Sequence, residues 1–178
     1  MTDAAPPIFR LSATLLSRGF ALRPENEEDL PFLIRLYATT REAELAITGW
    51  SPEQKQAFVV SQFQAQHQFY RNQIPDCGFD VIECQGEQIG RLYLAPGRTR
   101  LNIVDIALTP EWCGQGIGTS ILRALMETAE QSGRGVVIFV EKYNPALRLY
   151  RRLGFTEIQD VGMHFEMEWV PADASPVS

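Results

Sequence analysis

Three glycines at alternate positions, Gly114, Gly116 and Gly118, lie between an apolar segment and an amphipathic one. Glycine has no Cβ, so a backbone that contains it can turn tightly and approach a ligand closely. A helix that begins in such a turn points its free N–H groups and the positive end of its dipole into the turn, which binds phosphate without a basic side chain. Tight strand–helix turns also use glycine for steric reasons alone. The spacing therefore indicates either an anion-binding loop or a simple turn.

Two other phosphate-binding loops fit this stretch less well. A Walker loop ends in Gly-Lys followed by Ser or Thr, and here the loop ends Gly116-Ile117-Gly118-Thr119 without a lysine. A dinucleotide-binding loop needs G-x-G-x-x-G and an acidic residue at the end of the next strand. Glu141 does end the next expected strand, but the glycine spacing is G-x-G-x-G. An enzyme that binds NAD or ATP is therefore the weakest of the interpretations considered.

A second segment, residues 144–155, has the form of a short capped helix. Asn144 and Pro145 suit the N-cap and the first helical position, and Gly154 suits the left-handed position after the last turn. Tyr150 lies on this helix among several arginines. A tyrosine on a half-buried helix is commonly a core residue whose hydroxyl finds a partner, so the residue type alone leaves its role open.

The elements that must position these residues follow from hydrophobic periodicity and turn signals. The pattern predicts strands over 20–23, 79–84, 88–94, 100–108 and 136–140, a final hairpin over 155–169, and helices that begin near 26 and 52 and span 116–132 and 145–153. A meander that gives way to strand–helix–strand–helix implies a mixed α/β sheet with helices on its faces. We expect one domain over 18–170, with a loosely ordered arm (1–17) before it and a frayed tail (171–178) after it.

Together, residues 101–155 resemble the signature of the GNAT superfamily of acyl-CoA-dependent N-acetyltransferases. The loop pattern of that family, Gln/Arg-x-x-Gly-x-Gly/Ala, falls on Cys113 to Gly118, with Cys113 where glutamine or arginine is usual. The pattern N-x-A-x-x-L-Y-x-x-x-G-F matches residues 144–155. The resemblance implies a single-domain GNAT-like fold: a mostly antiparallel mixed sheet of about six or seven strands, about four flanking helices, and a central, splayed pair of parallel strands.

The same resemblance implies acetyl-CoA as the co-substrate and no metal ion. The expected contacts with it are Ile106, Ala107, Leu108, Cys113, Gly114, Gln115, Gly116, Ile117, Gly118, Thr119 and Asn144. Tyr150 would be the general acid at the thioester sulfur, because a phenol with an ordinary pKa of about 10 is protonated at neutral pH and can protonate a departing thiolate. Cys113, next to a helix N-terminus, is either a reactive thiol of lowered pKa or a residue that fills the loop wall.

The amine acceptor needs a base and a binding site. Asp105 lies in an apolar strand and Glu141 ends the neighbouring strand, so either carboxylate could accept the proton, directly or through water. The alternative is that Asp105 only holds the loop and that Glu141 is solvated. Glu42, Glu44 and Trp50 surround the break between the first two helices and could bind a cation by charge and by an aromatic face. The alternative for these three is solvated helix-end charges and a core tryptophan.

The composition limits the partners. The net charge is −6, the pI is about 5.0 and no cluster of basic residues is present, which argues against nucleic acid as a partner. No apolar run is long enough to cross a bilayer, and the N-terminus lacks the features of a signal peptide. The three cysteines have no metal-binding spacing. These features predict a cytoplasmic protein that binds neither nucleic acid nor membrane.

The interpretation that joins these features is an N-acetyltransferase that moves an acetyl group from acetyl-CoA to a primary amine by direct attack in a ternary complex. The acceptor would be a small-molecule amine or a protein amine, and a homodimer is compatible with the resemblance. The alternative is a non-catalytic acyl-CoA-binding sensor or interaction module. The cysteine in the loop and the unidentified base count in favour of that alternative.

Overall fold

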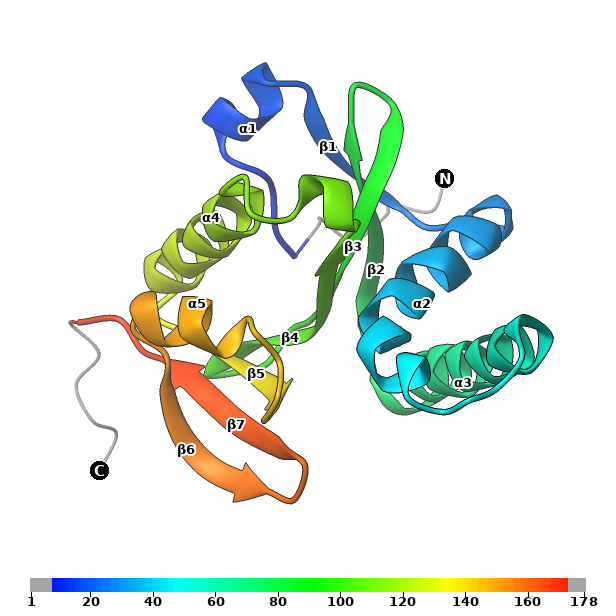
Figure 1. Ribbon diagram of the computed structural model, residues 1–178. Helices are drawn as coiled ribbons and strands as arrows, with labels where there is room; N and C mark the ends of the chain where they lie inside the picture. The colour runs from blue at the N-terminus through cyan, green and yellow to red at the C-terminus, as the bar shows by residue number, and fades with distance from the viewer. Residues whose placement is uncertain (1–7, 173–178) are drawn as a thin grey trace.

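The computed structural model of the protein describes residues 8–172. Its centre is a mixed sheet of seven strands in the order β1-β2-β3-β4-β5-β7-β6 (Figure 1). β4 and β5 are parallel, and every other neighbouring pair is antiparallel. This confirms the predicted fold class, including the central parallel pair. The strands are β1 (Phe20–Pro24), β2 (Gly78–Cys84), β3 (Glu87–Ala95), β4 (Arg100–Leu108), β5 (Gly135–Glu141), β6 (Thr156–Val161) and β7 (His164–Trp169).

Helices lie on both sides of this sheet. Figure 1 shows α1, α4 and α5 on one side and α2 and α3 on the other. The described residues hold one α-helix more than the sequence predicts, because α1 is additional. The helices are α1 (Ala13–Ser17), α2 (Leu30–Ala46), α3 (Pro52–Gln73), α4 (Ile117–Gln131) and α5 (Leu147–Arg152), with 3-10 turns η1 (Glu27–Asp29) and η2 (Pro110–Trp112).

The additional helix, α1, lies in the segment expected to be a loosely ordered arm. Its N-cap is Ser12, whose hydroxyl accepts a hydrogen bond from the backbone N–H of Leu15 at 3.3 Å. Phe9, Leu11 and Leu15 are all buried in the larger apolar core. The described part of the arm is therefore packed, and the expectation is corrected there. The rest of the expected arm (residues 1–7) and most of the expected tail (173–178) lie outside the described residues.

Each side of the sheet buries an apolar cluster of its own. The larger cluster joins α1, α4 and α5 to the strands and includes Ile103 and Ile138 of the parallel pair. The smaller cluster joins α2 and α3 to β2 and includes Leu33, Phe63 and Val81. The sheet therefore separates two layers of helices that do not share a core.

The long helix α3 begins where the sequence signal predicts. Ser51 and Gln54 form a reciprocal capping box, and Pro52 occupies the first turn, where its missing N–H costs nothing. Although α3 has 22 residues, it buries only Val59 and Phe63. Most of its surface therefore faces solvent.

Candidate active site

The two parallel strands separate halfway along their length. β4 and β5 pair only over Arg100–Ile103 and Gly135–Ile138. Beyond this point β4 is paired with β3 alone, and β5 with β7 alone. In the β3–β4 pairing the register passes from Ile103 directly to Asp105, so Val104 is an extra residue in β4. Such a bulge bends a strand, and its position accounts for the divergence of β4 from β5.

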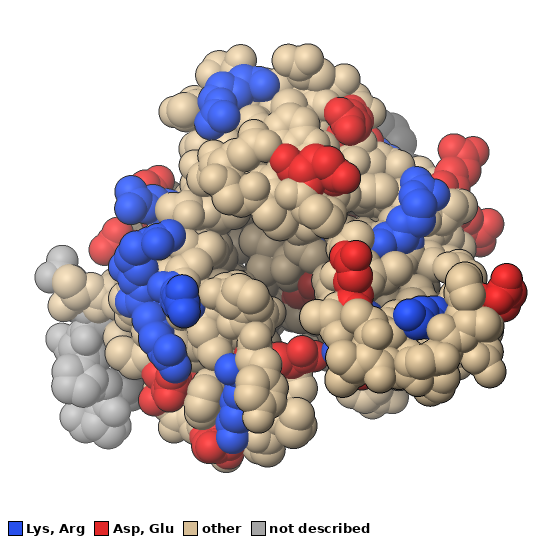
Figure 2. All heavy atoms as spheres, in the orientation of Figure 1, with Lys and Arg blue, Asp and Glu red and all other residues tan. Residues whose placement is uncertain are grey.

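The open edge of β4 borders a hollow in the surface. Val104–Leu108 have no pairing with β5, so the N–H and C=O groups on that edge lack a strand partner. Figure 2 shows this face hollowed at its centre, between the α4–α5 side and the α2–α3 side. Ile106, Ala107 and Leu108 are all partly exposed there. The expected splay is therefore present, and the contacts of these three residues with a ligand stay a prediction.

The glycine loop follows β4 and opens α4. Gly116, the N-cap of α4, has a φ of +80°, and Gly114 has a φ of +73°, in the left-handed region that favours glycine. A Cβ on either residue would meet no atom within 4 Å, so the backbone conformation, rather than crowding, requires glycine. The first N–H of α4 with a backbone acceptor is that of Ser120, which donates to the Gly116 carbonyl at 3.0 Å. The N–H groups of Ile117–Thr119 therefore stay available at a helix N-terminus, as a phosphate site requires.

Two side chains of the loop form hydrogen bonds with nearby backbone carbonyls. The Cys113 thiol donates to the Leu108 carbonyl at 3.6 Å. Partial burial of the sulfur and the nearby Glu111 carboxylate raise the pKa of this thiol, which contradicts the alternative of a reactive thiol of lowered pKa. The Gln115 carboxamide folds back and donates to the Glu111 carbonyl at 2.6 Å. Both side chains are therefore tied to backbone carbonyls of the preceding segment.

Tyr150 is buried on α5 and faces the same region. Its ring lies edge-on to Phe155, with 5.6 Å between the ring centroids, and the residue is 4% exposed. Burial raises the pKa of Tyr150 well above its ordinary value, and the negative charge of Asp105 raises that pKa further. The phenol is therefore protonated at neutral pH and lies near enough to Asp105 to feel its charge. No hydrogen bond to a residue within 8–172 contributes to this pKa.

α5 starts two residues later than predicted. The N–H groups of Leu147 and Arg148 donate to the carbonyls of Asn144 and Pro145, at 3.1 and 3.4 Å, which is the tighter 3-10 geometry. The Asn144 side chain accepts from the Ala146 N–H at 2.9 Å, as a cap residue does. Asn144 is exposed, so its carboxamide nitrogen is open to a ligand, and its contact with one stays a prediction.

Each of the two candidate bases is held by an arginine. Asp105 Oδ2 accepts from Arg91 Nη2 at 2.7 Å, and the Asp105 side chain is 18% exposed. Glu141 Oε1 accepts from Arg41 Nη1 at 3.1 Å, and the Glu141 side chain is 45% exposed. The structure therefore places Asp105 in the open half of β4, where its charge acts on Tyr150, and places Glu141 at the end of β5, where it is more exposed.

Glu42, Glu44 and Trp50 lie at the end of α2 and in its connection to α3. Glu44 forms an ion pair with Arg41 at 3.4 Å and is mostly exposed. Trp50 is also exposed, with its ring edge-on to Phe58, so it is not a core tryptophan. Glu42 lines a groove between α2 and the start of α3. Arg41 connects this region to the site, because it contacts both Glu44 and the carboxylate at the end of β5.

The two arginines were missed by sequence-based prediction. Arg91 lies in β3 and is 2% exposed. It is the single charged residue in the apolar run Ile89–Ala95. That pattern could have indicated an ion pair, because a buried charge needs a partner. Arg41 had no such signal, since charges on a half-exposed helix are ordinary. Its partner at the end of β5 is 100 residues away in sequence.

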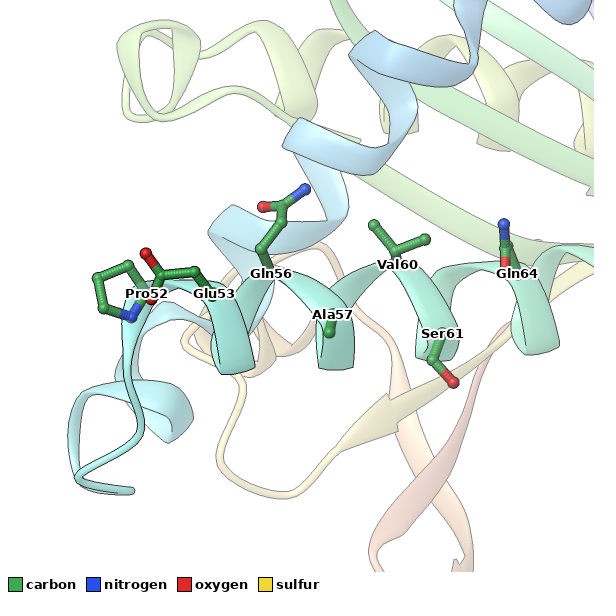
Figure 3. A pocket seen from close by; sticks show the side chains of 7 residues that line it. All are labelled: Pro52, Glu53, Gln56, Ala57, Val60, Ser61 and Gln64. Atoms are coloured by element: carbon green, nitrogen blue, oxygen red, sulfur yellow. The ribbon is translucent and has the colours of Figure 1, made fainter.

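Another hollow lies along α3. Figure 3 shows the side chains that line it, which all come from that helix: Pro52, Glu53, Gln56, Ala57, Val60, Ser61 and Gln64. None of them belongs to β4, the glycine loop or α5, so this groove is separate from the site. Within residues 8–172 there is no group of three side chains that could hold a metal ion. No helix in that part of the chain has the length and apolar character to cross a membrane.

Comparison with known proteins agrees with this geometry. The family model for an acetyltransferase (GNAT) domain matches residues 75–157, which contain the splayed strand, the glycine loop and α5. The N-alpha-acetyltransferase of Sulfurisphaera tokodaii is 29% identical to this chain over 101 residues. The match covers 47% of this chain and 59% of that relative, so it spans less than two thirds of the relative's length.

Solved structures show the same fold over most of the chain. The PaiA N-acetyltransferase of Thermoplasma acidophilum, in complex with coenzyme A, has a TM-score of 0.63 and 19% identity, and the match covers 85% of this chain and 99% of that one. An acetyltransferase of Salmonella typhimurium that modifies the N-terminal serine of ribosomal protein L7/L12 has a TM-score of 0.57 and 22% identity, over 93% and 98% of the two chains. At these identities the likeness concerns the fold alone.

Proposed function

The chain belongs to the GNAT superfamily, and from that membership we propose that it transfers an acetyl group from acetyl-CoA to a primary amine by direct attack in a ternary complex. The observation that carries the proposal is the arrangement at the open half of β4. A strand edge without a partner is followed by a loop with available N–H groups, and a protonated phenol lies near the carboxylate of Asp105. These are the parts that such a transfer requires.

The residues fit acetyl-CoA as the co-substrate. The available N–H groups of Ile117–Thr119 and the dipole of α4 would hold the pyrophosphate. The loop supplies no lysine or arginine between Cys113 and Thr119, so backbone dipoles must provide this attraction. The open edge of Ile106–Leu108 would pair with the amides of the pantetheine arm, and the exposed carboxamide of Asn144 would assist.

The proposed step moves two protons. The amine nitrogen attacks the thioester carbonyl carbon, the C–S bond breaks, and Tyr150 donates a proton to the departing sulfur as general acid. Asp105 accepts the proton that the attacking amine loses. We prefer Asp105 to Glu141 because its side chain is less exposed and lies near Tyr150, whereas Glu141 is 45% exposed. Holding both reactants in one cleft removes much of the entropic cost of the reaction.

We propose a protein N-terminal α-amine as the first acceptor class to test. The support is indirect: one relative is an N-alpha-acetyltransferase, and one protein of the same fold modifies an N-terminal serine. The net charge of −6 would favour a cationic acceptor of any kind. A small-molecule amine is therefore the comparison class.

The test is an assay of acetyl transfer to a matched pair of peptides. One peptide has a free N-terminal serine and an internal lysine, and the other has the same sequence with a blocked N-terminus. We expect CoA thiol release and the mass increase of one acetyl group with the first peptide only. Transfer to both peptides would place the acceptor at the lysine. Thiol release with neither peptide nor with a panel of small amines, although acetyl-CoA binds, would favour the non-catalytic sensor instead.

We also propose that the acetyltransferase domain extends beyond the matched residues 75–157. β1, α1 and α2 lie before the match, and β7 lies after it. Phe20 of β1, Leu15 of α1 and Met167 of β7 are all buried in the same large cluster as the glycine-loop helix. We infer that the elements expected over 18–170 form one packed unit together with α1.

A further inference from the structure

Arg91 is a buried charge whose position stability alone does not explain. It lies in the middle of β3 and is 2% exposed. Burying a guanidinium costs several kcal/mol, and an ion pair in a protein interior is often no more stable than an apolar pair of the same volume. The partner of Arg91 is Asp105, at 2.7 Å, in the open half of β4. The pair therefore joins the interior of the sheet to the carboxylate that we propose as the base.

The Arg91 guanidinium is held from several directions. Its Nη2 donates to Asp105 Oδ2 and, at 3.2 Å, to Gln66 Oε1 of α3. Its carbon lies 5.1 Å from the centre of the Tyr93 ring. Its Nε is buried and has no hydrogen-bond partner among the described residues, so the guanidinium is held mainly through Nη2.

This arrangement occupies one oxygen of Asp105 and leaves the other accessible. Oδ2 is bound to Arg91, while the side chain as a whole remains 18% exposed. In the β3–β4 pairing, Arg91 lies opposite Ala107, and Tyr93 lies opposite Asp105. The Arg91 side chain therefore contacts a residue two positions before its direct partner on β4. A carboxylate fixed in this way can present its second oxygen in only a narrow range of directions.

We propose that Arg91, anchored by Gln66, is a positioning residue that aims the free oxygen of Asp105 at the acceptor amine where β4 leaves β5. This inference rests on the proposed function, and it adds a residue that acts through Asp105 rather than on the substrate. Its consequence is that Arg91 contributes to turnover only when Asp105 is present. A purely structural arginine would contribute equally with and without that carboxylate.

The experiment is a double-mutant cycle on turnover. We measure kcat and the KM for acetyl-CoA in wild type, Arg91→Met, Asp105→Asn and the double variant, with the acceptor peptide that the wild type acetylates. Misplacing a catalytic group by about 1 Å can cost about 100-fold in rate, so we expect Arg91→Met to lower kcat by roughly 10- to 100-fold and to leave that KM unchanged. In the Asp105→Asn background the same change should lower kcat by less than about 2-fold. Arg91→Lys should restore part of the rate.

A matched control separates this effect from the loss of any ion pair on the sheet. Arg100 also contacts carboxylates, those of Glu166 and Glu168 at 3.4 Å each, but in the half of β4 that is paired with β5. We expect Arg100→Met to leave kcat within about 2-fold of wild type. An equal loss of kcat from Arg91→Met in both backgrounds would overturn the proposal, and so would an Asp105→Asn variant with full turnover.

A milder variant keeps the test valid if Arg91→Met does not fold. Gln66→Leu removes one anchor and keeps the ion pair, with the exposed Gln68→Leu on the same helix as its control. We expect Gln66→Leu to lower kcat by about 2- to 5-fold in the wild-type background. In the Asp105→Asn background, the same change should leave kcat unaffected. Unchanged kcat in Gln66→Leu together with additive effects of Arg91→Lys and Asp105→Asn would contradict the proposal. A wild-type protein without any turnover would instead contradict the proposed function.

Discussion

The two sides of the sheet bury different kinds of residue. On the side of α1, α4 and α5 the core is one large cluster of apolar side chains. On the side of α2 and α3 the apolar cluster is smaller, and charged residues are buried beside it. Arg91 and Asp29 are each 2% exposed, and Glu25, whose side chain is also 2% exposed, accepts a hydrogen bond from the Tyr93 hydroxyl at 2.6 Å.

The difference separates the tasks that we propose for the two sides. The apolar side holds the glycine loop and Tyr150 in place, so changes there should alter acyl-CoA binding or the departure of the thiol. The charged side holds Asp105, so changes there should alter the activation of the amine. Both sides reach the same point, the open half of β4, because the bulge at Val104 turns that strand away from β5.

The largest effect should come from Gly116→Glu on the apolar side. A side chain at a φ of +80° is strained, and a negative charge would oppose the pyrophosphate at the helix N-terminus. We expect acetyl-CoA binding to fall by about 100-fold or more, measured by calorimetry. Gly133→Glu is the matched control, because Gly133 has a φ of +64° with open space around it, at the other end of α4. Equal acetyl-CoA affinity in the two variants would contradict the loop assignment.

Tyr150→Phe should affect turnover rather than binding. Removing a general acid typically costs about 100-fold or more in rate, so we expect kcat to fall by that order while the affinity for acetyl-CoA stays within about 2-fold. No hydrogen bond from the Tyr150 hydroxyl to a described residue contributes to its pKa, so its removal should not lower the melting temperature. The exposed Tyr143→Phe serves as control. Unchanged kcat in Tyr150→Phe would mean that another group protonates the sulfur.

Asp29→Asn should change stability and leave the chemistry intact. Both oxygens of Asp29 accept hydrogen bonds from Arg23 at 2.7 Å, and these bonds lower its pKa from 3.8 to about 2. A lowered pKa stabilises the fold above pH 4, and this contribution is lost as the pH falls towards 2. We expect Asn to lower the free energy of unfolding by about 2 kcal/mol at pH 7 and by less at pH 3, measured by urea denaturation.

The control for that change is Asp76→Asn, at an exposed carboxylate in the turn after α3. It should leave the free energy of unfolding within about 0.5 kcal/mol of wild type at both pH values. A loss of stability in Asp29→Asn that did not depend on pH would show that shape, rather than charge, makes Asp29 necessary. If Asp29→Asn lowered kcat without changing the free energy of unfolding, Asp29 would have a catalytic role and not only a structural one.

The smallest effect should come from Glu141→Gln. Its side chain is 45% exposed, and its ion pair with Arg41 lies at the mouth of the site, where such pairs contribute little. We expect kcat to change by less than about 3-fold, against a far larger loss in Asp105→Asn. A greater loss in Glu141→Gln than in Asp105→Asn would exchange the roles of the two carboxylates.

The apolar side was the more predictable from the sequence. The strand 100–108 has the predicted bounds, and the helix predicted over 116–132 is present as Ile117–Gln131, because regular periodicity and glycines at special φ values are local signals. α1 escaped prediction because its five residues are too few to show a helical period, and the burial of Leu15 depends on strands far along the chain. The first turn of α5 has 3-10 rather than α-helical hydrogen bonds. Such differences at a helix end cannot be predicted from the sequence.

The charged side was harder to predict because its contacts are long-range. Asp105 was a candidate from its place in an apolar strand, but its arginine is 14 residues away on another strand. The link between Arg41 and Glu141 spans 100 residues. Periodicity shows which face of an element is buried, and it does not show which charge on another element lies opposite. Pairing of buried charges is therefore the part of this site that required the structure.

The central claim is that the glycine loop and the open half of β4 form a site for acyl-CoA. Thermal-shift titrations with acetyl-CoA, CoA, NAD and ATP, run in parallel on the wild-type protein, test it most directly. A ligand at about 100 times its dissociation constant adds roughly 2.7 kcal/mol to the free energy of unfolding, which is a readily measured rise in melting temperature. We predict such a rise with acetyl-CoA and CoA and none with NAD or ATP. A rise with NAD or ATP and none with CoA would contradict the account.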